Sequence, residues 1–313
     1  MISQNTEERV PLGTLFTAIS LYVVWGLLPI YWKMLETVPA LDVLAHRIVW
    51  AFFFMIGLIW ATGRGGRLWA EMKTVLANRR KLLSLLAGSI FVSINWLTYI
   101  WAVTNDRMVE SSLGYYINPL LQVLLGVIVF RERLSLWQFL AIALAATGVL
   151  YLTVSFGSLP MVAALLAGSF TAYGYCKKIT GLSAVGGMTM ETALLAPVAA
   201  TYLLIFYAQG QGVPVGANQI FMLLLGTGVI TAVPLIIFAH SINRLPMTVI
   251  GLVQFVSPTM TLLLGIFAYH EAFSRQHFIA FSFIWSGCAL FALARTAPMA
   301  RLERGILRRL NRA

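Results

Sequence analysis

Charged residues and catalytic motifs are both scarce in this sequence. Asp, Glu, Lys and Arg make up 11% of its 313 residues, against roughly 25% in an average soluble domain, so a water-exposed globular fold is disfavoured. The two cysteines, Cys176 and Cys288, lie far apart and lack the spacing of a metal or redox site. We therefore interpret both as packing residues.

Missing motifs argue against several enzyme classes. The chain contains no HExxH, no GxSxG, no paired aspartate motif and no GxxxxGK[ST] phosphate loop, which are signatures of zinc proteases, serine hydrolases and ATP-hydrolysing proteins. The histidines show no metal-ligand spacing; they are His46, His240, His270 and His277. The sequence thus predicts a protein that is not an enzyme and uses no cofactor, metal or ATP of its own.

Long apolar runs are what the sequence has in abundance. Hydrophobic residues make up 59% of the chain, and its mean hydropathy is +0.84. A bilayer core of about 30 Å needs roughly 20 helical residues, and we therefore predict an all-α polytopic membrane protein with ten transmembrane helices. The acidic, polar start of the chain indicates that the first helix is retained rather than cleaved as a signal peptide. The ten runs are 12–32, 41–62, 82–103, 113–130, 136–156, 159–176, 187–208, 219–242, 247–269 and 278–294.

The net charge of +11 is distributed unevenly about these runs. If the N-terminus is cytoplasmic, eighteen of the 22 Lys and Arg residues fall on the cytoplasmic side, and three, Lys33, Arg107 and Arg275, fall outside. Arg47 alone lies within a run. This bias follows the positive-inside rule and predicts that both termini are cytoplasmic. The basic tail, residues 296–313, is expected to lie against anionic lipid, and nucleic acid is not expected as a partner.

A shift of 139 residues aligns the chain with itself, without a gap, from 113–148 to 252–287. Each copy holds five runs, an odd number, so the second copy is expected to enter the membrane in the opposite orientation. The predicted organisation is two inverted five-helix repeats, residues 1–156 and 157–295, followed by the tail at 296–313. The matched pairs are Pro119 and Pro258, Gly126 and Gly265, Glu132 and Glu271, Ser135 and Ser274, Phe139 and Phe278, Ala141 and Ala280, and Gly148 and Gly287.

Five stretches, together with this repeat, resemble the EamA group of the drug/metabolite transporter superfamily, and within it the RarD-type branch. They are "WGLLPIYWK" (25–33), "AHRIVW" (45–50), "NWLTYIWAV" (95–103), "ESSLGYYINPLLQVLLG" (110–126) and "QFVSPTMTLLLGIFAYHE" (254–271). The resemblance covers nearly the whole chain. It implies a permease of the bacterial inner membrane, often an exporter of small metabolites or amphipathic compounds, without defining one substrate.

Polar residues form a stripe in the fourth run. Their spacing places them on one helical face; they are Ser111, Tyr115, Asn118 and Gln122. Three of these positions are polar again in the second copy, where they are Gln254, Ser257 and Thr261. Such stripes avoid lipid, so two interpretations stay open: they line a substrate cavity, or they hydrogen-bond neighbouring helices.

Pro119 and Pro258 are expected to kink their helices, because proline removes a backbone donor. The bend would either shape the bundle permanently or serve as a hinge for alternating access. Glu132 and Glu271 are each followed three residues later by a serine that suits a helix N-cap, so we interpret them as tying the turn between two helices. Residues 135–138, "SLWQ", read as a capping box.

Among the ionisable residues of the apolar runs, three are the main candidates for a functional role: His46, Arg47 and Glu191. A buried arginine needs a partner, unless it snorkels to the interface. Glu191 is expected at the other side of the membrane, so an Arg47–Glu191 pair is not inferred. Each is a candidate for binding a substrate charge or carrying a proton, and proton coupling and facilitated exchange stay open as alternatives.

Aromatic residues supply the remaining substrate candidates. Tyr22 and Trp25, and Asn95 and Tyr99, each combine a ring with a nearby polar group and suit an aromatic or cationic ligand. Tyr173 is included because Tyr173-Gly174 occupies the place of Trp25-Gly26 in the second copy. Core packing is the alternative for each of them, and most tryptophans near the ends of runs are expected in the interfacial belt.

The function predicted from these features is a secondary transporter that moves a small molecule by alternating access, in contact with membrane lipid. A channel and a non-transporting membrane protein, such as a scaffold or sensor, are the alternatives. Both a monomer and a homodimer are compatible with the sequence.

Overall fold

Long helices dominate the chain. The computed structural model describes residues 12–130, 135–213, 216, 218–242, 253–294 and 296–310, and within these ranges it contains no strand. The elements are α1 (Leu12–Lys33), α2 (Ala40–Ala61), α3 (Gly65–Leu76), α4 (Arg79–Thr104), α5 (Met108–Phe130), α6 (Leu136–Phe156), α7 (Met161–Thr180), α8 (Ala184–Ala208), α9 (Gln219–Ile242), α11 (Val256–Leu263), the π-helix η1 (Leu264–Ala268), α12 (Arg275–Ala294) and α13 (Ala297–Leu310). The all-α prediction is therefore confirmed for this part of the chain.

Six described helices are long and apolar enough to cross a membrane. They are α2, α4, α5, α6, α8 and α12. Shorter apolar segments cover Gln219–Pro234 and Val256–Ala268, and much of the predicted run 247–269 before α11 lies outside the described residues. The number of ten transmembrane helices therefore stays a prediction.

Local signals set several helix ends. At the start of α6 the capping box is present as predicted: the Gln138 amide donates to Ser135 Oγ at 3.2 Å, and the Ser135 amide donates to Gln138 Oε1 at 3.0 Å. The same helix ends at Gly157, whose φ of 67° lies in the left-handed region that glycine adopts without strain.

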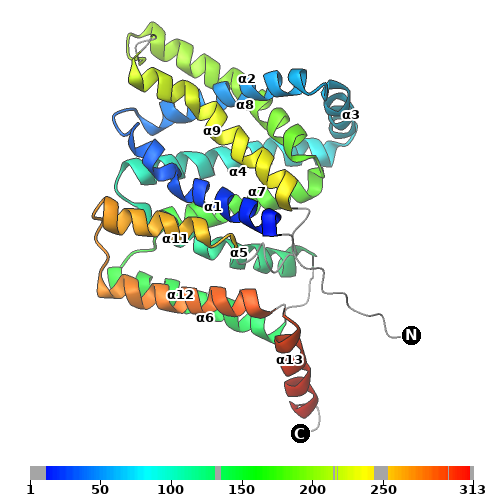
Figure 1. Cartoon of the computed structure of the whole chain (residues 1–313), viewed down its shortest axis with the longest axis vertical. Helices are drawn as coiled ribbons and strands as arrows, with labels where there is room; N and C mark the ends of the chain where they lie inside the picture. Colours follow the sequence, from blue (N-terminus) through cyan, green and yellow to red (C-terminus); the bar gives the residue numbers. More distant parts are fainter. Residues whose placement is uncertain are drawn as a thin grey trace.

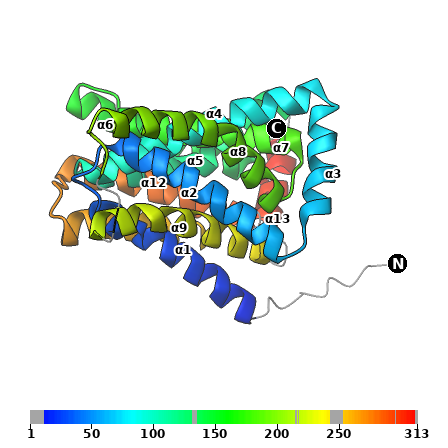
Figure 2. The same ribbon diagram turned by 90° about the horizontal axis from the view of Figure 1, so that it is seen from above.

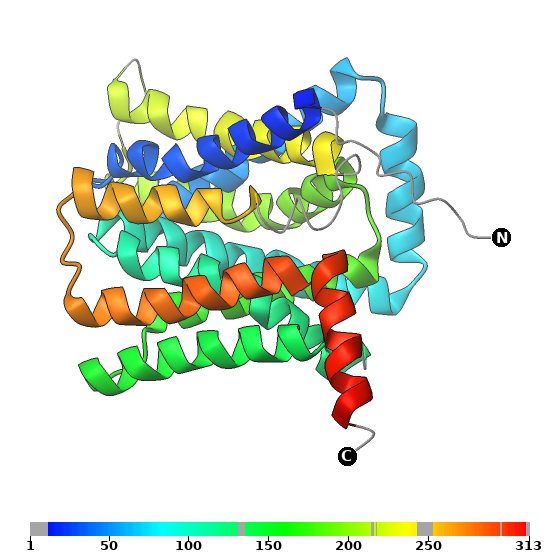
Figure 3. The ribbon, with the colours of Figure 1, turned by 60° about the horizontal axis from the view of Figure 1, so that its bottom comes forward.

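The long helices lie side by side in one bundle (Figure 1). The turns from α1 to α2, α4 to α5, α6 to α7 and η1 to α12 gather at one end, whereas α3 and α13 lie at the other. Figure 2 shows α3 standing across that end of the bundle. Helices α6 and α12 form a closely packed pair along one side (Figures 1 and 3).

The basic tail forms α13, which leaves the end of α12 and meets the start of α6 (Figure 3). Glu303 Oε1 accepts from the Leu136 amide at 2.6 Å, and the Trp137 indole donates to the Met299 carbonyl at 3.0 Å. The tail is thus tied to the bundle by hydrogen bonds, while its predicted contact with lipid stays a prediction.

Two glycines of the internal repeat let α6 and α12 approach closely. A Cβ at Gly148 would lie 2.7 Å from the Ala280 carbonyl oxygen, and a Cβ at Gly287 would lie 2.7 Å from that of Ala141. The contact is reciprocal, because the shift of 139 residues converts one half of it into the other. Glycine is required at both positions by the separation of the two helices.

The two repeat prolines do not occupy equivalent places. Pro119 lies inside α5, as predicted, whereas Pro258 lies in the first turn of α11. A missing N–H costs little in a first turn. Because most of the segment before α11 lies outside the described residues, the kink expected at Pro258 stays a prediction. Cys176 and Cys288 are buried free thiols, which agrees with a packing role.

Candidate functional site

Arg47 lies in the interior of the bundle, on α2. Its side chain is only 7% exposed, and its Nε donates to Thr231 Oγ1 of α9 at 2.8 Å. The guanidinium carbon lies 4.1 Å from the ring centroid of Trp96 and 5.0 Å from that of Trp32. Arg47 therefore does not snorkel to the surface, and Trp32, which is fully buried, is not an interfacial belt residue.

A chain of polar contacts lies beside this arginine. The Tyr115 hydroxyl of α5 donates to Asn95 Oδ1 of α4 at 3.4 Å, and Asn95 Nδ2 donates to the Leu166 carbonyl at 3.0 Å and to Ser169 Oγ at 3.2 Å. The rings of Tyr99 and Tyr115 meet edge to face with centroids 5.5 Å apart. Asn95 is almost fully buried, so these hydrogen bonds satisfy a polar group inside the bundle.

We call this group of residues the central cluster. Tyr99 lies beside Thr261 of α11 and so extends the cluster to that helix, and the positive charge of the cluster is that of Arg47. It draws side chains from six helices and offers aromatic faces, hydroxyl groups, one amide and a guanidinium to the same region. Its members are Trp32 (α1), Arg47 (α2), Asn95, Trp96 and Tyr99 (α4), Tyr115 (α5), Thr231 (α9) and Thr261 (α11).

The predicted polar stripe of α5 is divided between two neighbours. Tyr115 belongs to the central cluster, whereas Asn118 Oδ1 accepts from Thr171 Oγ1 of α7 at 3.1 Å and from Gln122 Nε2 at 3.4 Å. Gln122 itself is exposed, and Ser111 is buried with no hydrogen-bond partner for its hydroxyl. Part of the stripe thus joins helices, as the packing interpretation requires.

The second predicted stripe is only partly assembled. Thr261 is buried in the central cluster, whereas Gln254 and Ser257 are half-buried at and just before the start of α11. The Ser257 carbonyl and Met260 lie against Gly26 of α1, where an added Cβ would come within 2.6 Å of Met260 Cβ.

Tyr22 and Trp25 face each other on α1. Both are half-buried, with their ring centroids 5.2 Å apart in an edge-to-face arrangement. They precede the Gly26 contact with α11, which places this aromatic pair beside the junction of α1 and α11.

Glu191 forms a separate charged group between α7 and α8. It is 5% exposed, and its carboxylate accepts from Lys177 Nζ and from the Tyr173 hydroxyl, each at 3.0 Å. Tyr173 is therefore positioned against Glu191 rather than in the central cluster. The structure pairs Glu191 with Lys177 and not with Arg47.

His46 lies toward α8 and α9. Its Nε2 is 3.5 Å from the Tyr207 hydroxyl, and its ring meets the ring of Phe221 at 6.5 Å. The other ring nitrogen is buried without a hydrogen-bond partner. One turn earlier, the buried Asp42 accepts from the Tyr202 hydroxyl at 2.5 Å, so this face of α2 carries two ionisable groups.

Acidic residues hold the turn end of the bundle together. The Glu271 carboxylate accepts from the backbone amides of Met108 and Val109 at 2.6 and 2.8 Å and so caps α5. Burial raises the pKa of this carboxyl above its ordinary value, although the two amides and Lys33 act in the opposite direction. Glu271 thus ties two distant segments, rather than only its own turn; its counterpart Glu132 lies outside the described residues.

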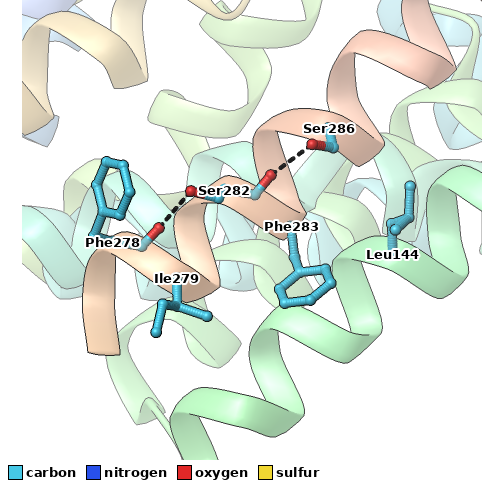
Figure 4. A pocket seen from close by; sticks show the side chains of 6 residues that line it. All are labelled: Leu144, Phe278, Ile279, Ser282, Phe283 and Ser286. Carbon is cyan, nitrogen blue, oxygen red and sulfur yellow. Dashed lines mark hydrogen bonds between the residues drawn. The ribbon is translucent and has the colours of Figure 1, made fainter. Parts of the chain in front are cut away.

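A groove on the outer side of α12 is a poor site candidate. Figure 4 shows its lining, in which Ser282 and Ser286 donate to carbonyl groups of their own helix at 2.8 Å. Their hydroxyl groups are therefore already used, and the remaining lining is apolar. The lining residues are Leu144, Phe278, Ile279, Ser282, Phe283 and Ser286.

Some members of these groups could not be selected from the sequence. Trp96 and Thr231 are ordinary residues for an apolar helix, and only their contact with Arg47 distinguishes them. Lys177 counted as one more basic residue of a cytoplasmic turn. Its place in the last turn of α7, just before the helix that carries Glu191, was the available signal.

The comparisons with known proteins agree on one family. The EamA-like transporter family matches residues 12–154. An uncharacterized transporter of Bacillus subtilis, YojE, is 45% identical over 93% of this chain and 96% of its own. Protein RarD of Escherichia coli is 39% identical over 94% and 96%, and the chloramphenicol-sensitive protein RarD of Pseudomonas aeruginosa is 30% identical over 84% and 88%.

The fold has a counterpart among solved structures. A crystal structure that covers 91% of this chain superposes with a TM-score of 0.56 at 17% identity, a likeness that concerns the fold alone. The relatives are similar along nearly their whole length and are bacterial, and several are named as transporters. The chain therefore belongs to the EamA-like family of the drug/metabolite transporter superfamily, in its RarD branch, and is a multi-pass membrane transporter.

Proposed function

We propose that this protein is a secondary transporter that exports a small metabolite or an amphipathic, drug-like compound across the bacterial inner membrane by alternating access. The central cluster is the observation that carries the proposal. Polar and charged side chains within a membrane bundle are costly and usually mark a binding site or an ion path. Here such side chains converge from six helices that belong to both proposed halves. A carrier with two moving halves would hold its cargo between them.

The proposed cargo site extends from the central cluster along both repeats. Further aromatic and polar groups would contact the cargo as it enters or leaves. Beyond the cluster, these positions are Tyr22, Trp25, Asn118, Gln122, Tyr173, Gln254 and Ser257.

The inverted repeat is proposed from the sequence and is supported by the packing. With residues 1–156 and 157–295 as the halves, α1 corresponds to α7, α2 to α8, α4 to α9, α5 to α11 and α6 to α12. Three close contacts between helices of unlike position in the two halves then have their counterparts: α4–α7 with α9–α1, α5–α7 with α11–α1, and α2–α9 with α8–α4. The reciprocal glycine contacts of α6 and α12 have the same symmetry.

Both ends of the bundle offer groups for gating and coupling. With cytoplasmic termini, the turn end that holds Lys33, Asp106 and Glu271 would face outward; Lys33 Nζ lies 2.7 Å from Asp106 Oδ1 there. At the other end, the buried pair of Glu191 with Lys177 is our candidate for proton coupling. His46, Pro119 and Pro258 are proposed to assist the movement.

Counterflow in proteoliposomes tests this function. Vesicles loaded with one unlabelled compound from a broad metabolite and drug panel should take up the same labelled compound faster than empty vesicles. Planar-bilayer recordings should show no unitary conductance, because the polar side chains form clusters rather than a continuous path. A conducting protein without counterflow would favour the channel instead.

Two substitutions test whether the polar stripes bind cargo or only join helices, and collapse of the pH gradient tests proton coupling. Asn118→Ala and Ser257→Ala should each weaken the apparent affinity for the exchanged compound. Wild-type transport in both would make the stripes contacts between helices only. Collapse of the pH gradient should slow net transport by the wild type but not by Glu191→Gln. An unchanged wild-type rate would contradict proton coupling.

A further inference from the structure

The positive charge of Arg47 has no counter-ion among the described residues. The five ion pairs of this part of the chain do not include Arg47. Two buried acidic residues have partners other than Arg47. Asp42 accepts a hydrogen bond from Tyr202, and Glu191 accepts one from Lys177. An unpaired charge inside a membrane bundle is strongly unfavourable, so its retention asks for a partner that the chain does not supply.

The guanidinium also has unused hydrogen-bond donors. An arginine carries five N–H groups and accepts no hydrogen bond. Of these, the structure gives one, Nε–H, an acceptor in the described chain, the hydroxyl of Thr231 at 2.8 Å. Because the residue is only 7% exposed, bulk water does not surround the guanidinium and cannot satisfy these donors.

The groups around Arg47 are hydrogen-bond donors and aromatic rings, and none of those described is a negatively charged acceptor. The indole N–H of Trp32 is buried and has no partner in the described chain, and the ring of Trp32 lies against the guanidinium. The Tyr115 hydroxyl already donates to Asn95. What is missing here is an anionic acceptor, and the planar fork of arginine matches a carboxylate in two parallel hydrogen bonds.

The walls of the site indicate what the anion is attached to. Trp32, Trp96, Tyr99 and Tyr115 surround the guanidinium region with large rings. Such faces bind apolar or aromatic groups and exclude strongly hydrated ones. The rings of Trp96 and Tyr115 are only half-buried and so can contact such a group, whereas a small inorganic ion would make no use of them.

We propose that the central cluster binds the carboxylate of an organic anion with an apolar or aromatic body, and that Arg47 is its anchor. This inference rests on the proposed transport function and narrows its cargo to one charge class. Arg47 is a binding residue here, and Thr231 is the positioning residue that fixes the guanidinium through Nε.

The test compares one body in three charge states. The probes are phenyl, indolyl and hexyl compounds, each as the acetate-type carboxylate, its neutral amide and the corresponding amine. Thermal unfolding of the purified full-length protein in lipid nanodiscs reports binding, and counterflow in proteoliposomes reports transport. Sodium acetate and sodium chloride serve as small anions without a body.

We expect at least one carboxylate to raise the melting temperature, and its apparent affinity to exceed that of its amide by about tenfold or more. Arg47→Gln should abolish this preference, and Arg47→Lys should keep part of it because the charge remains. Thr231→Val should weaken binding of the carboxylate yet preserve the preference. Arg80→Gln, an exposed arginine in the first turn of α4, is the matched control and should behave as wild type.

Several results would overturn the inference. They are equal or stronger stabilisation by amides or amines, no stabilisation by any carboxylate, an unchanged preference in Arg47→Gln, and equal stabilisation by chloride or acetate. The unliganded melting temperature of each variant shows whether it folds, and Thr231→Val retains the test if Arg47→Gln does not. Counterflow of amides or amines alone would support the transport function and contradict the carboxylate as cargo. Stabilisation by carboxylates without any counterflow would support the carboxylate site and contradict the transport function.

Discussion

At the scale of single residues, the interior of this bundle is organised by hydrogen bonds that cross between helices. Asn95 has the central place, because its amide donates to the Leu166 carbonyl and to Ser169 of α7 while its oxygen accepts from Tyr115 of α5. A buried amide of this kind must stay paired, since an unpaired polar group costs about 1–3 kcal/mol. Asn95 therefore both fixes the helices and keeps the Tyr115 ring beside the proposed cargo site.

The Tyr115 hydroxyl can be removed with little change in shape. Tyr115→Phe should leave the fold intact and reduce the apparent affinity for cargo by about two- to tenfold, the effect of one neutral hydrogen bond. Counterflow at a series of cargo concentrations measures it. Tyr151→Phe on α6, a half-buried tyrosine outside the central cluster, is the control and should equal wild type. An unchanged affinity in Tyr115→Phe would assign this hydroxyl to packing alone.

At the scale of elements, helices are joined by caps and by close crossings. Glu271, from the turn before α12, caps α5 through two short hydrogen bonds. Glu110 of α5 in turn accepts from the Val162 amide at 3.0 Å, at the start of α7. Carboxylates at helix N-termini stabilise the exposed amides and the positive end of the helix dipole. These contacts link the turns of both proposed repeats at one end of the bundle.

Loss of the Glu271 cap should be measurable. Glu271→Ala leaves two amides of α5 without their acceptor and should cost about 1–3 kcal/mol of unfolding free energy, seen as a lower melting temperature in detergent. Glu36→Gln alters an exposed ion pair and should cost less than about 1 kcal/mol. Equal effects of the two changes would mean that the cap adds no stability.

The same residue makes a pH-dependent contribution. Because the pKa of Glu271 is raised in the folded state, the folded protein holds this proton more tightly than the unfolded chain does. Its contribution is complete below the ordinary glutamate value of about 4.3 and is lost as pH rises through the folded value. Between wild type and Glu271→Gln, which cannot titrate, the stability difference should move in favour of the variant over this window; a constant difference would contradict it.

The crossing of α6 and α12 depends on the absence of two side chains. Gly148→Ala places a Cβ against the Ala280 carbonyl and should destabilise the protein by about 1–3 kcal/mol, the cost of overpacking. Gly168→Ala on α7 is the matched control, because nothing lies within 4 Å of its Cβ and alanine favours the helix. Thermal unfolding of both variants measures the difference. A Gly148→Ala variant as stable as Gly168→Ala would mean that the helices separate without cost.

Much of the architecture was accessible from the sequence because its signals are periodic or exceptional. Apolar runs predicted most helices, the capping box at Ser135 was found as predicted, and Arg47 stood out as a charge in hydrocarbon. Its partners did not, because Trp96 and Thr231 gain their meaning only from packing between distant helices. The places of the two repeat prolines could not be foreseen for a related reason, since the repeat copies the residue whereas the packing decides where α11 starts.

At the scale of the whole molecule, the central cluster draws its side chains from helices of both proposed halves, and one of its members, Trp32, lies at the end of α1 that leads into the turn to α2. All six helices that build the cluster pack against a helix of the opposite half. A movement of one half against the other would therefore open the cluster first to one side and then to the other, as alternating access requires.

Two-sided labelling of Thr261 tests this account most directly. In a variant with Cys176 and Cys288 replaced by alanine, Thr261→Cys places one thiol in the buried cluster, and a charged, membrane-impermeant thiol reagent is added to either face of vesicles of known orientation. The account predicts labelling from both faces, while Ser286→Cys on the outer side of α12 stays unlabelled because its thiol faces lipid. Labelling of Thr261→Cys from one face only, or from neither, would contradict alternating access through the central cluster.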